Sequence, residues 1–178
     1  MSTLSKIRSF FILGLPRSRT TWLTAYMSDS QVFCSQETFS FPNHEYDGED
    51  FWKIHGYLYR GSVDNEPVNA TPYMRDLEAP LVVIDRSPPE VYKSLLNIFD
   101  SHPKVLKELV QKSSEALEEA KLFADIIVPY NKIDTHLEDI CDLCIPSVGY
   151  NEAKHMMFKQ MNIQHGGLSE ANFSKRYL

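Results

Sequence analysis

Two arginines and two threonines follow an early apolar run in an order that suits a bound anion. The segment GLPRSRTT, residues 14–21, supplies positive charge at Arg17 and Arg19 and adds hydroxyl donors at its end. The run before it, Ser9–Leu15, is typical of a strand buried on both faces, and Thr20–Ser28 has apolar residues at helical spacing. A helix N-terminus carries free N–H groups and a positive dipole end. The segment therefore predicts a loop that binds phosphate or sulfate.

The spacing of this loop is similar to the nucleotide P-loop, G-x-x-x-x-G-K-[ST], but two positions differ. Arg19 stands where the P-loop has its second glycine, and Thr20 stands where it has lysine. That lysine reaches the terminal phosphates of a nucleoside triphosphate. An ordinary ATP or GTP site is therefore not the first expectation.

The same residues, PRSRTTWL, resemble the 5′-phosphosulfate loop of sulfotransferases, P-[KR]-S-G-T-T-x-L. These enzymes bind 3′-phosphoadenosine 5′-phosphosulfate (PAPS) on a P-loop-like fold. The resemblance implies that Arg17 takes the place of the catalytic Lys or Arg, and that Trp22 stacks on adenine. The cofactor-binding residues implied by this loop are Pro16, Arg17, Ser18, Arg19, Thr20, Thr21 and Trp22.

A second segment, LVVIDRSPPEVYKSLL, resembles the stretch with which the same family binds the 3′-phosphate. In that stretch an Arg ends a strand and a Ser follows eight residues later on the next helix. Arg86 and Ser94 have this spacing. Arg can bind a phosphate through two parallel hydrogen bonds, so the pair is expected to form the second anion pocket.

A third segment, Asp125–Pro146, resembles a strand–Tyr–turn–helix stretch of the family that carries no chemistry. No residue after Tyr150 has a counterpart. The basic-glycine loop that closes over the 3′-phosphate in the family is not found, and His165–Gly167 or Lys175–Arg176 are the candidates to replace it.

The candidate general base is Glu37. The stretch Cys34–Thr38 resembles the C-G-E-E-T stretch of tyrosylprotein sulfotransferases, whose second Glu is the proposed base. Cytosolic members of the family use a His, so His44 and His55 are the alternatives. The resemblance implies in-line attack of the acceptor oxygen on sulfur, with proton removal by the base, charge neutralisation by Arg17 and no metal requirement.

Strands that alternate with helices predict a fold of class α/β, with three α/β/α layers around a central parallel sheet, P-loop-like in the sulfotransferase manner. The chain is expected to form a single domain over 1–178. Residues 39–75 are irregular and hold eight of the 21 aromatic residues, so they are expected to form a lid or acceptor-binding insertion. The expected strands are Ser9–Leu15, Gln31–Cys34, Leu81–Arg86 and Asp125–Tyr130. The expected helices are Thr20–Ser28, Glu49–Tyr59, Glu90–Phe99, Lys104–Phe123, Thr135–Leu143 and Glu152–Met161.

Composition narrows the range of partners and locations. The 178 residues carry a formal net charge of −6, which argues against a nucleic-acid-binding protein. No apolar run approaches the about 20 residues of a membrane span. Three cysteines are an odd number, which favours a reducing cytoplasm. Cys141 and Cys144 have C-x-x-C spacing, but core cysteines are the better interpretation than zinc or redox chemistry.

The predicted function is transfer of a sulfuryl group from PAPS to a hydroxyl or amine of a small-molecule or peptide acceptor, leaving 3′,5′-adenosine bisphosphate (PAP). Two alternatives stay open. One is a nucleotide or small-molecule kinase with a degenerate P-loop, whose magnesium would bind at Asp85. The other is a non-catalytic nucleotide-binding protein of the same fold. The sequence also leaves a homodimer open.

Overall fold

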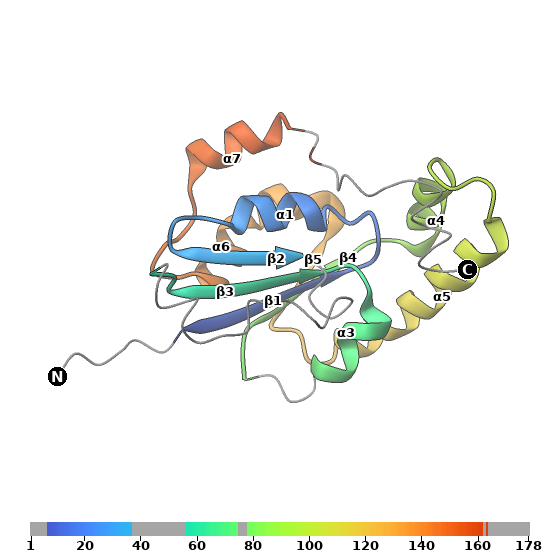
Figure 1. Cartoon of the computed structure of the whole chain (residues 1–178), viewed down its shortest axis with the longest axis horizontal. Helices are drawn as coiled ribbons and strands as arrows, with labels where there is room; N and C mark the ends of the chain where they lie inside the picture. Colours follow the sequence, from blue (N-terminus) through green and yellow to red (C-terminus); the bar gives the residue numbers. More distant parts are fainter. Residues whose placement is uncertain (1–6, 37–55, 75–77, 162, 164–178) are drawn as a thin grey trace.

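A computed structural model of the chain describes residues 7–36, 56–74, 78–161 and 163 (Figure 1). Its centre is a sheet of five parallel strands in the order β2-β3-β1-β4-β5. The strands are β1 (Arg8–Gly14), β2 (Val32–Gln36), β3 (Tyr59–Asp64), β4 (Leu81–Asp85) and β5 (Ile126–Pro129). The helices are α1 (Thr20–Met27), α3 (Pro67–Met74), α4 (Pro88–Leu96), α5 (Pro103–Ala120), α6 (Leu137–Cys144), α7 (Glu152–Lys159) and the 3-10 helix η1 (Tyr130–Thr135).

Helices cover both faces of the sheet, which confirms the predicted α/β class and three layers. One face packs against α1 and α6, and the opposite face packs against α3, α4 and α5. Figure 1 shows α1, α6 and α7 on one side of the strands and α3 and α5 on the other. Along β4, Val82 and Ile84 enter the first core while Leu81 and Val83 enter the second. Successive side chains of a strand point to opposite faces, so burial on both faces produces the continuous apolar run seen in the sequence.

The connections of β1 and β4 leave the sheet on opposite faces. The chain passes from β1 through α1 to β2 on the first face, whereas α4 and α5 connect β4 to β5 over the second face. Because β1 and β4 are neighbours in the sheet, their carboxyl ends form a topological switch point. Ligands of open parallel sheets bind in the crevice at such a point. The topology therefore favours a ligand site at the loops after β1 and β4.

Two elements correct the prediction of an irregular segment over residues 39–75. Tyr59–Asp64 is β3, a central strand between β2 and β1, and Pro67–Met74 is α3, which packs on β1 and α5. These residues belong to the framework of the fold and not to a lid. The expected helix Glu49–Tyr59 is wrong at its end, since Tyr59 begins the strand, and residues 39–55 lie outside the described ones. The other predicted strands and helices match within about three residues at each end.

β3 was missed because its buried positions are mostly not apolar. The strand reads YRGSVD, and Gly61 faces Phe10 across the β1–β3 pair. The Phe10 ring is fully buried and covers the glycine so closely that a Cβ there would lie 2.1 Å from Phe10 Cζ. A search for alternating apolar residues does not detect a buried strand position that is occupied by glycine.

Gly61→Ala is expected to destabilise the protein. The added methyl group would displace the Phe10 ring from the core, and overpacking of this kind costs about 1–3 kcal/mol. For a domain of this size the melting temperature falls by roughly 2–12 °C, measured by calorimetry or circular dichroism. Adding Phe10→Leu should restore part of the lost stability. If the double variant instead lost as much stability as the two single variants together, displacement of the Phe10 ring would not be the cause.

None of the helices among the described residues combines the length and the apolar character needed to cross a bilayer.

Candidate functional site

The loop after β1 turns tightly against β4. Gly14, the last residue of β1, is closely surrounded, since a Cβ there would lie 3.2 Å from Ser18 Cβ and 3.3 Å from Ile84 Cβ. Ser18 N–H donates to the Leu15 carbonyl at 3.2 Å, which closes the turn. The glycine thus brings the loop to the end of β4, where the second predicted anion pocket begins.

Arg17 and Arg19 both adopt the left-handed backbone conformation, with φ of 66° and 61°. For a residue with a side chain this conformation costs about 1–2 kcal/mol. Arg19 is the N-cap of α1, and its side chain makes no capping hydrogen bond. The first N–H groups of α1 therefore have no side-chain cap and remain available to an anion.

Arg17, Arg86 and Ser94 come together although 77 residues separate the first from the last. Arg17 Nε donates to Ser94 Oγ at 3.3 Å. The Arg86 guanidinium donates to the backbone carbonyl of Arg17. It also lies over the Tyr130 ring, with Cζ 4.0 Å from the centroid. The two anion-binding segments predicted separately from the sequence are thus in direct contact.

Positive charge is concentrated here, and among the described residues no ion pair joins Arg17 to a carboxylate. Burial of the guanidinium and the nearby charge of Arg86 lower the pKa of Arg17 below its ordinary value. Two buried polar atoms of the described residues, Ser18 Oγ and Arg86 Nε, have no hydrogen-bond partner. Buried polar groups are normally satisfied, so unsatisfied ones mark a place for a ligand or a water. Two cations and two unpaired donors fit an anion.

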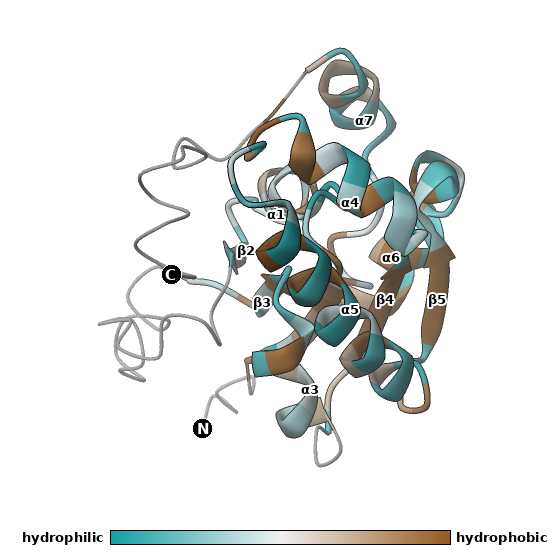
Figure 2. Ribbon diagram, turned by 90° about the vertical axis from the view of Figure 1, so that its right-hand side faces the viewer, coloured by the Kyte–Doolittle hydropathy of each residue, from teal (hydrophilic) through white to brown (hydrophobic). Residues whose placement is uncertain are grey.

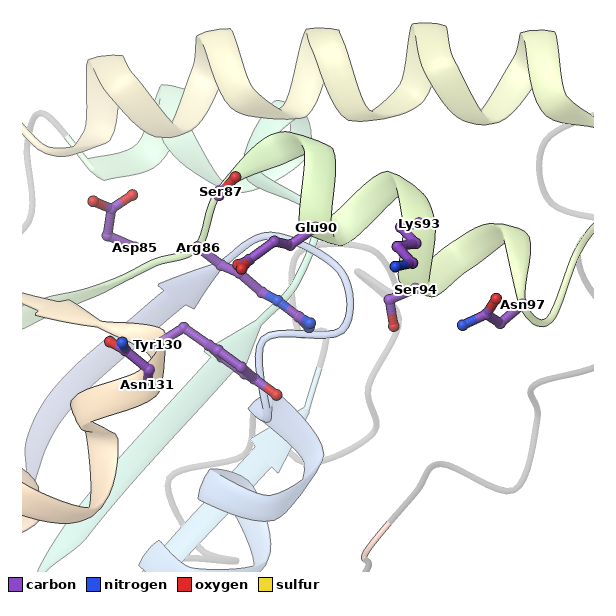
Figure 3. Close-up of a pocket in the computed structure, with 9 residues that line it drawn as sticks. All are labelled: Asp85, Arg86, Ser87, Glu90, Lys93, Ser94, Asn97, Tyr130 and Asn131. Carbon is purple, nitrogen blue, oxygen red and sulfur yellow. The ribbon is translucent and has the colours of Figure 1, made fainter.

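A pocket of about 570 Å³ opens beside this cluster, at the carboxyl ends of β4 and β5 (Figure 3). Lys93 and Ser94 of α4 and the C-cap residue Asn97 lie along one side of it. Tyr130 lies opposite beneath Arg86. The full lining is Asp85, Arg86, Ser87, Glu90, Lys93, Ser94, Asn97, Tyr130 and Asn131. Most of these side chains are hydrogen-bond donors, so the pocket suits a polar, anionic ligand.

Asp85, the magnesium-binding position of the kinase alternative, is already paired. Its Oδ1 accepts from Lys121 Nζ at 2.9 Å, and the same ammonium group contacts Glu118 at 2.6 Å. Burial lowers the pKa of Lys121, but the hydrogen bonds that its ammonium group donates to both carboxylates outweigh burial and raise the pKa above its ordinary value. The carboxylate of Asp85 therefore does not contribute a free negative charge to the pocket.

Arg19 and Trp22 do not take the positions that the resemblance implies. The Arg19 guanidinium forms a two-point contact with Asp134, at 2.9 and 3.3 Å. It also covers the Trp22 ring, 4.1 Å from the centroid. Trp22 is only 3% exposed and stacks on Tyr26, and its indole N–H donates to the Phe158 carbonyl at 2.9 Å. The expected stacking of adenine on Trp22 does not fit this arrangement, because the ring has no open face.

The remaining residues of the loop differ in access. Ser18 and Thr20 are buried, and Pro16 and Thr21 are half-buried. Thr21 Oγ1 accepts from Gln36 Nε2 at 2.9 Å, which joins the end of β2 to the start of α1. Thr20 and Thr21 are thus the first two residues of α1. The sequence predicts the 5′-phosphate at this turn.

The candidates for the general base, Glu37 and its alternatives His44 and His55, lie outside the described residues. The candidate C-terminal segments 165–167 and 175–176 do so as well. All of them stay predictions.

Several residues of the site were not foreseen. Tyr130 and Asn131 directly follow β5, so the rule that places ligands at strand ends points to them. Lys93 directly precedes Ser94 on α4. Asn97, the C-cap residue, follows Ser94 by three residues, which is close to one helical turn. Asp134 had no local signal, because only the tertiary contact with Arg19 reveals its role.

The three cysteines are buried in the core on the α1 side of the sheet, which confirms the interpretation of Cys141 and Cys144 as core residues. Burial raises the pKa of the Cys141 thiol to about 11 and raises the pKa values of Cys34 and Cys144 as well. Within the described part of the chain no group of three or more His, Cys, Asp or Glu side chains is arranged to hold a metal ion.

No model of a known protein family matches the chain, and no curated protein is significantly similar to it.

Proposed function

We propose that the protein is a sulfotransferase-like enzyme that binds PAPS at the carboxyl ends of β1 and β4. The observation that carries the proposal is the contact of the Arg17 loop with Arg86 and Ser94. Sequence alone predicts these as two anion sites, and a ligand with two separate phosphate-type groups requires the sites to be neighbours. The unpaired buried donors Ser18 Oγ and Arg86 Nε support the same ligand class.

Each residue has a distinct part in the proposal. The first turn of α1, with Thr20 and Thr21, holds the 5′-phosphate through N–H and hydroxyl groups. Arg86 and Ser94 hold the 3′-phosphate. Arg17 lies between the two groups of donors, where it offsets negative charge on the bridging sulfate and phosphate oxygens.

The chemistry would come from PAPS itself, which carries an activated sulfuryl group. The residues of the chain orient the anions and stabilise charge, and electrostatic positioning supplies most of the catalysis in related phosphoryl transfers. Glu37 is the proposed base, and a hydroxyl or amine of a small molecule or peptide is the proposed acceptor.

The test is a calorimetric titration of the full chain with PAP, 5′-AMP and ATP with magnesium. A site that holds both phosphates should bind PAP at least tenfold more tightly than 5′-AMP, because the second phosphate adds charge-assisted hydrogen bonds worth about 1.5–3 kcal/mol. The Lys107→Ala variant serves as the control. It removes one positive charge from an exposed position of α5 that does not line the pocket.

Two outcomes would redirect the proposal. Tightest binding of ATP with magnesium would replace it by the kinase alternative. Equal binding of PAP and 5′-AMP would remove the second anion site altogether.

A further inference from the structure

The side chain of Arg19 is fixed on two sides. Asp134 accepts hydrogen bonds from both terminal nitrogens of the guanidinium, and the Trp22 ring lies against its flat face. The planar guanidinium recognises ligands by its edge and its face. Here the edge between the two terminal nitrogens binds Asp134, and one face lies against Trp22. The two-point contact that an arginine would offer to an anion is therefore already made with Asp134.

Asp134 is itself oriented by α7. Its Oδ1 accepts from His155 Nε2 at 3.0 Å, and His155 Nδ1 contacts the Tyr150 hydroxyl at 2.7 Å. His155 is 6% exposed and packs edge-on against Trp22. In Figure 1 α7 lies alongside α1 on the outside of the sheet, and contacts join the two helices. The carboxylate of Asp134 is thus placed from one direction by His155 and binds Arg19 in the other.

The backbone of Arg19 needs such support. The residue begins α1 with φ of 61°, a conformation that glycine adopts freely and that arginine rarely adopts. The direction of the first N–H groups of α1 depends on this conformation, since Arg19 is the residue from which the helix starts. If the backbone relaxed, those groups would no longer converge on one point.

We infer that Arg19 is a positioning residue. Its contacts with Asp134 and Trp22 hold the left-handed backbone conformation at the start of α1, which glycine would adopt without such contacts. Arg19 does not bind the anion itself. The inference rests on the proposed function only in that the loop is taken to hold an anion. It replaces the role as a phosphate ligand that the sequence predicts for Arg19.

The test compares Arg19→Ala, Arg19→Gly and Asp134→Asn. In Arg19→Ala the left-handed conformation is still unfavourable, and the contacts with Asp134 and Trp22 are lost. PAP affinity should therefore fall about 5- to 10-fold. Glycine needs no support, so Arg19→Gly should stay within about twofold of the wild type. Asp134→Asn keeps an oxygen for His155 but loses the second contact with Arg19. It should weaken PAP binding about 5-fold alone and have no further effect when combined with Arg19→Gly.

Two outcomes would overturn the inference. Arg19→Gly and Arg19→Ala could weaken binding equally, which would mean that the guanidinium contacts the anion. Asp134→Asn could weaken binding equally with and without Arg19→Gly, which would mean that Asp134 acts through α7 alone.

Thermal unfolding without ligand separates this inference from the proposed function. The melting temperature should follow the same order, with Arg19→Ala and Asp134→Asn below Arg19→Gly. If the wild type fails to bind PAP, the proposed function fails, but the order of melting temperatures still decides the inference. An order in which Arg19→Gly is no more stable than Arg19→Ala would overturn it.

Discussion

Arg86→Ala is expected to remove the preference for PAP over 5′-AMP. Under the proposed function, Arg86 gives the 3′-phosphate a charge-assisted contact, and its buried Nε has no hydrogen-bond partner among the described residues. Loss of such a contact costs about 2–3 kcal/mol. This corresponds to a roughly 30- to 140-fold weaker affinity for PAP at 1.4 kcal/mol per tenfold change. Isothermal titration calorimetry with PAP and 5′-AMP measures both affinities.

The affinity for 5′-AMP serves as the internal control. Arg86 also holds the Arg17 carbonyl and lies over Tyr130, so its removal could disturb the loop. An intact loop keeps 5′-AMP affinity within about threefold, while a disturbed loop weakens both ligands alike. Ser94→Ala is the milder companion, with about fivefold loss for PAP because one neutral hydrogen bond contributes about 1 kcal/mol. Full retention of PAP affinity in Arg86→Ala would place the second phosphate elsewhere.

Arg17→Ala is expected to reduce sulfuryl transfer about 100-fold or more. Removal of a donor aimed at developing negative charge typically lowers the rate by about 10²–10³-fold. The measurement is PAP release from PAPS with a panel of phenol, alcohol and amine acceptors. Arg17→Lys keeps a positive charge and should retain more activity than Arg17→Ala.

The backbone at Arg17 calls for a second control. Its φ of 66° favours glycine, so an alanine at this position adds strain to the loss of charge. Arg17→Gly removes the side chain without that strain. If the guanidinium acts on the ligand, both variants lose activity to the same extent, unlike the pair proposed for Arg19. Recovery in Arg17→Gly would reduce Arg17 to a backbone role.

A wild type that binds PAP and turns over no PAPS would instead support the non-catalytic alternative. The binding predictions for Arg86 and Ser94 would still hold in that case, because they concern recognition of the phosphates and not the transfer. Binding and turnover are therefore measured on the same variants.

The candidate site was partly predictable because two of its segments carry local patterns. The Arg17 loop and the Arg86–Ser94 pair each follow an apolar strand, and each begins a helix. Strand ends and helix starts are visible in a sequence, so the residue types at these points already suggest anion binding. Asp134 lacks such a pattern, since it meets Arg19 and His155 only after the chain has folded.

By itself the sequence determined the apolar strands β1, β4 and β5, the amphipathic helices and the basic and hydroxyl side chains of two loops at strand ends. These features follow from local periodicity and residue type, which a single chain displays directly. The tertiary structure alone decided that polar, glycine-containing β3 is a central strand, because the Phe10 ring on β1 fills the space over Gly61. It alone decided that Arg17 meets Ser94 while Arg19 meets Asp134. Which of two neighbouring arginines is free for a ligand depends on partners more than 70 residues away, and local patterns carry no information on such distances.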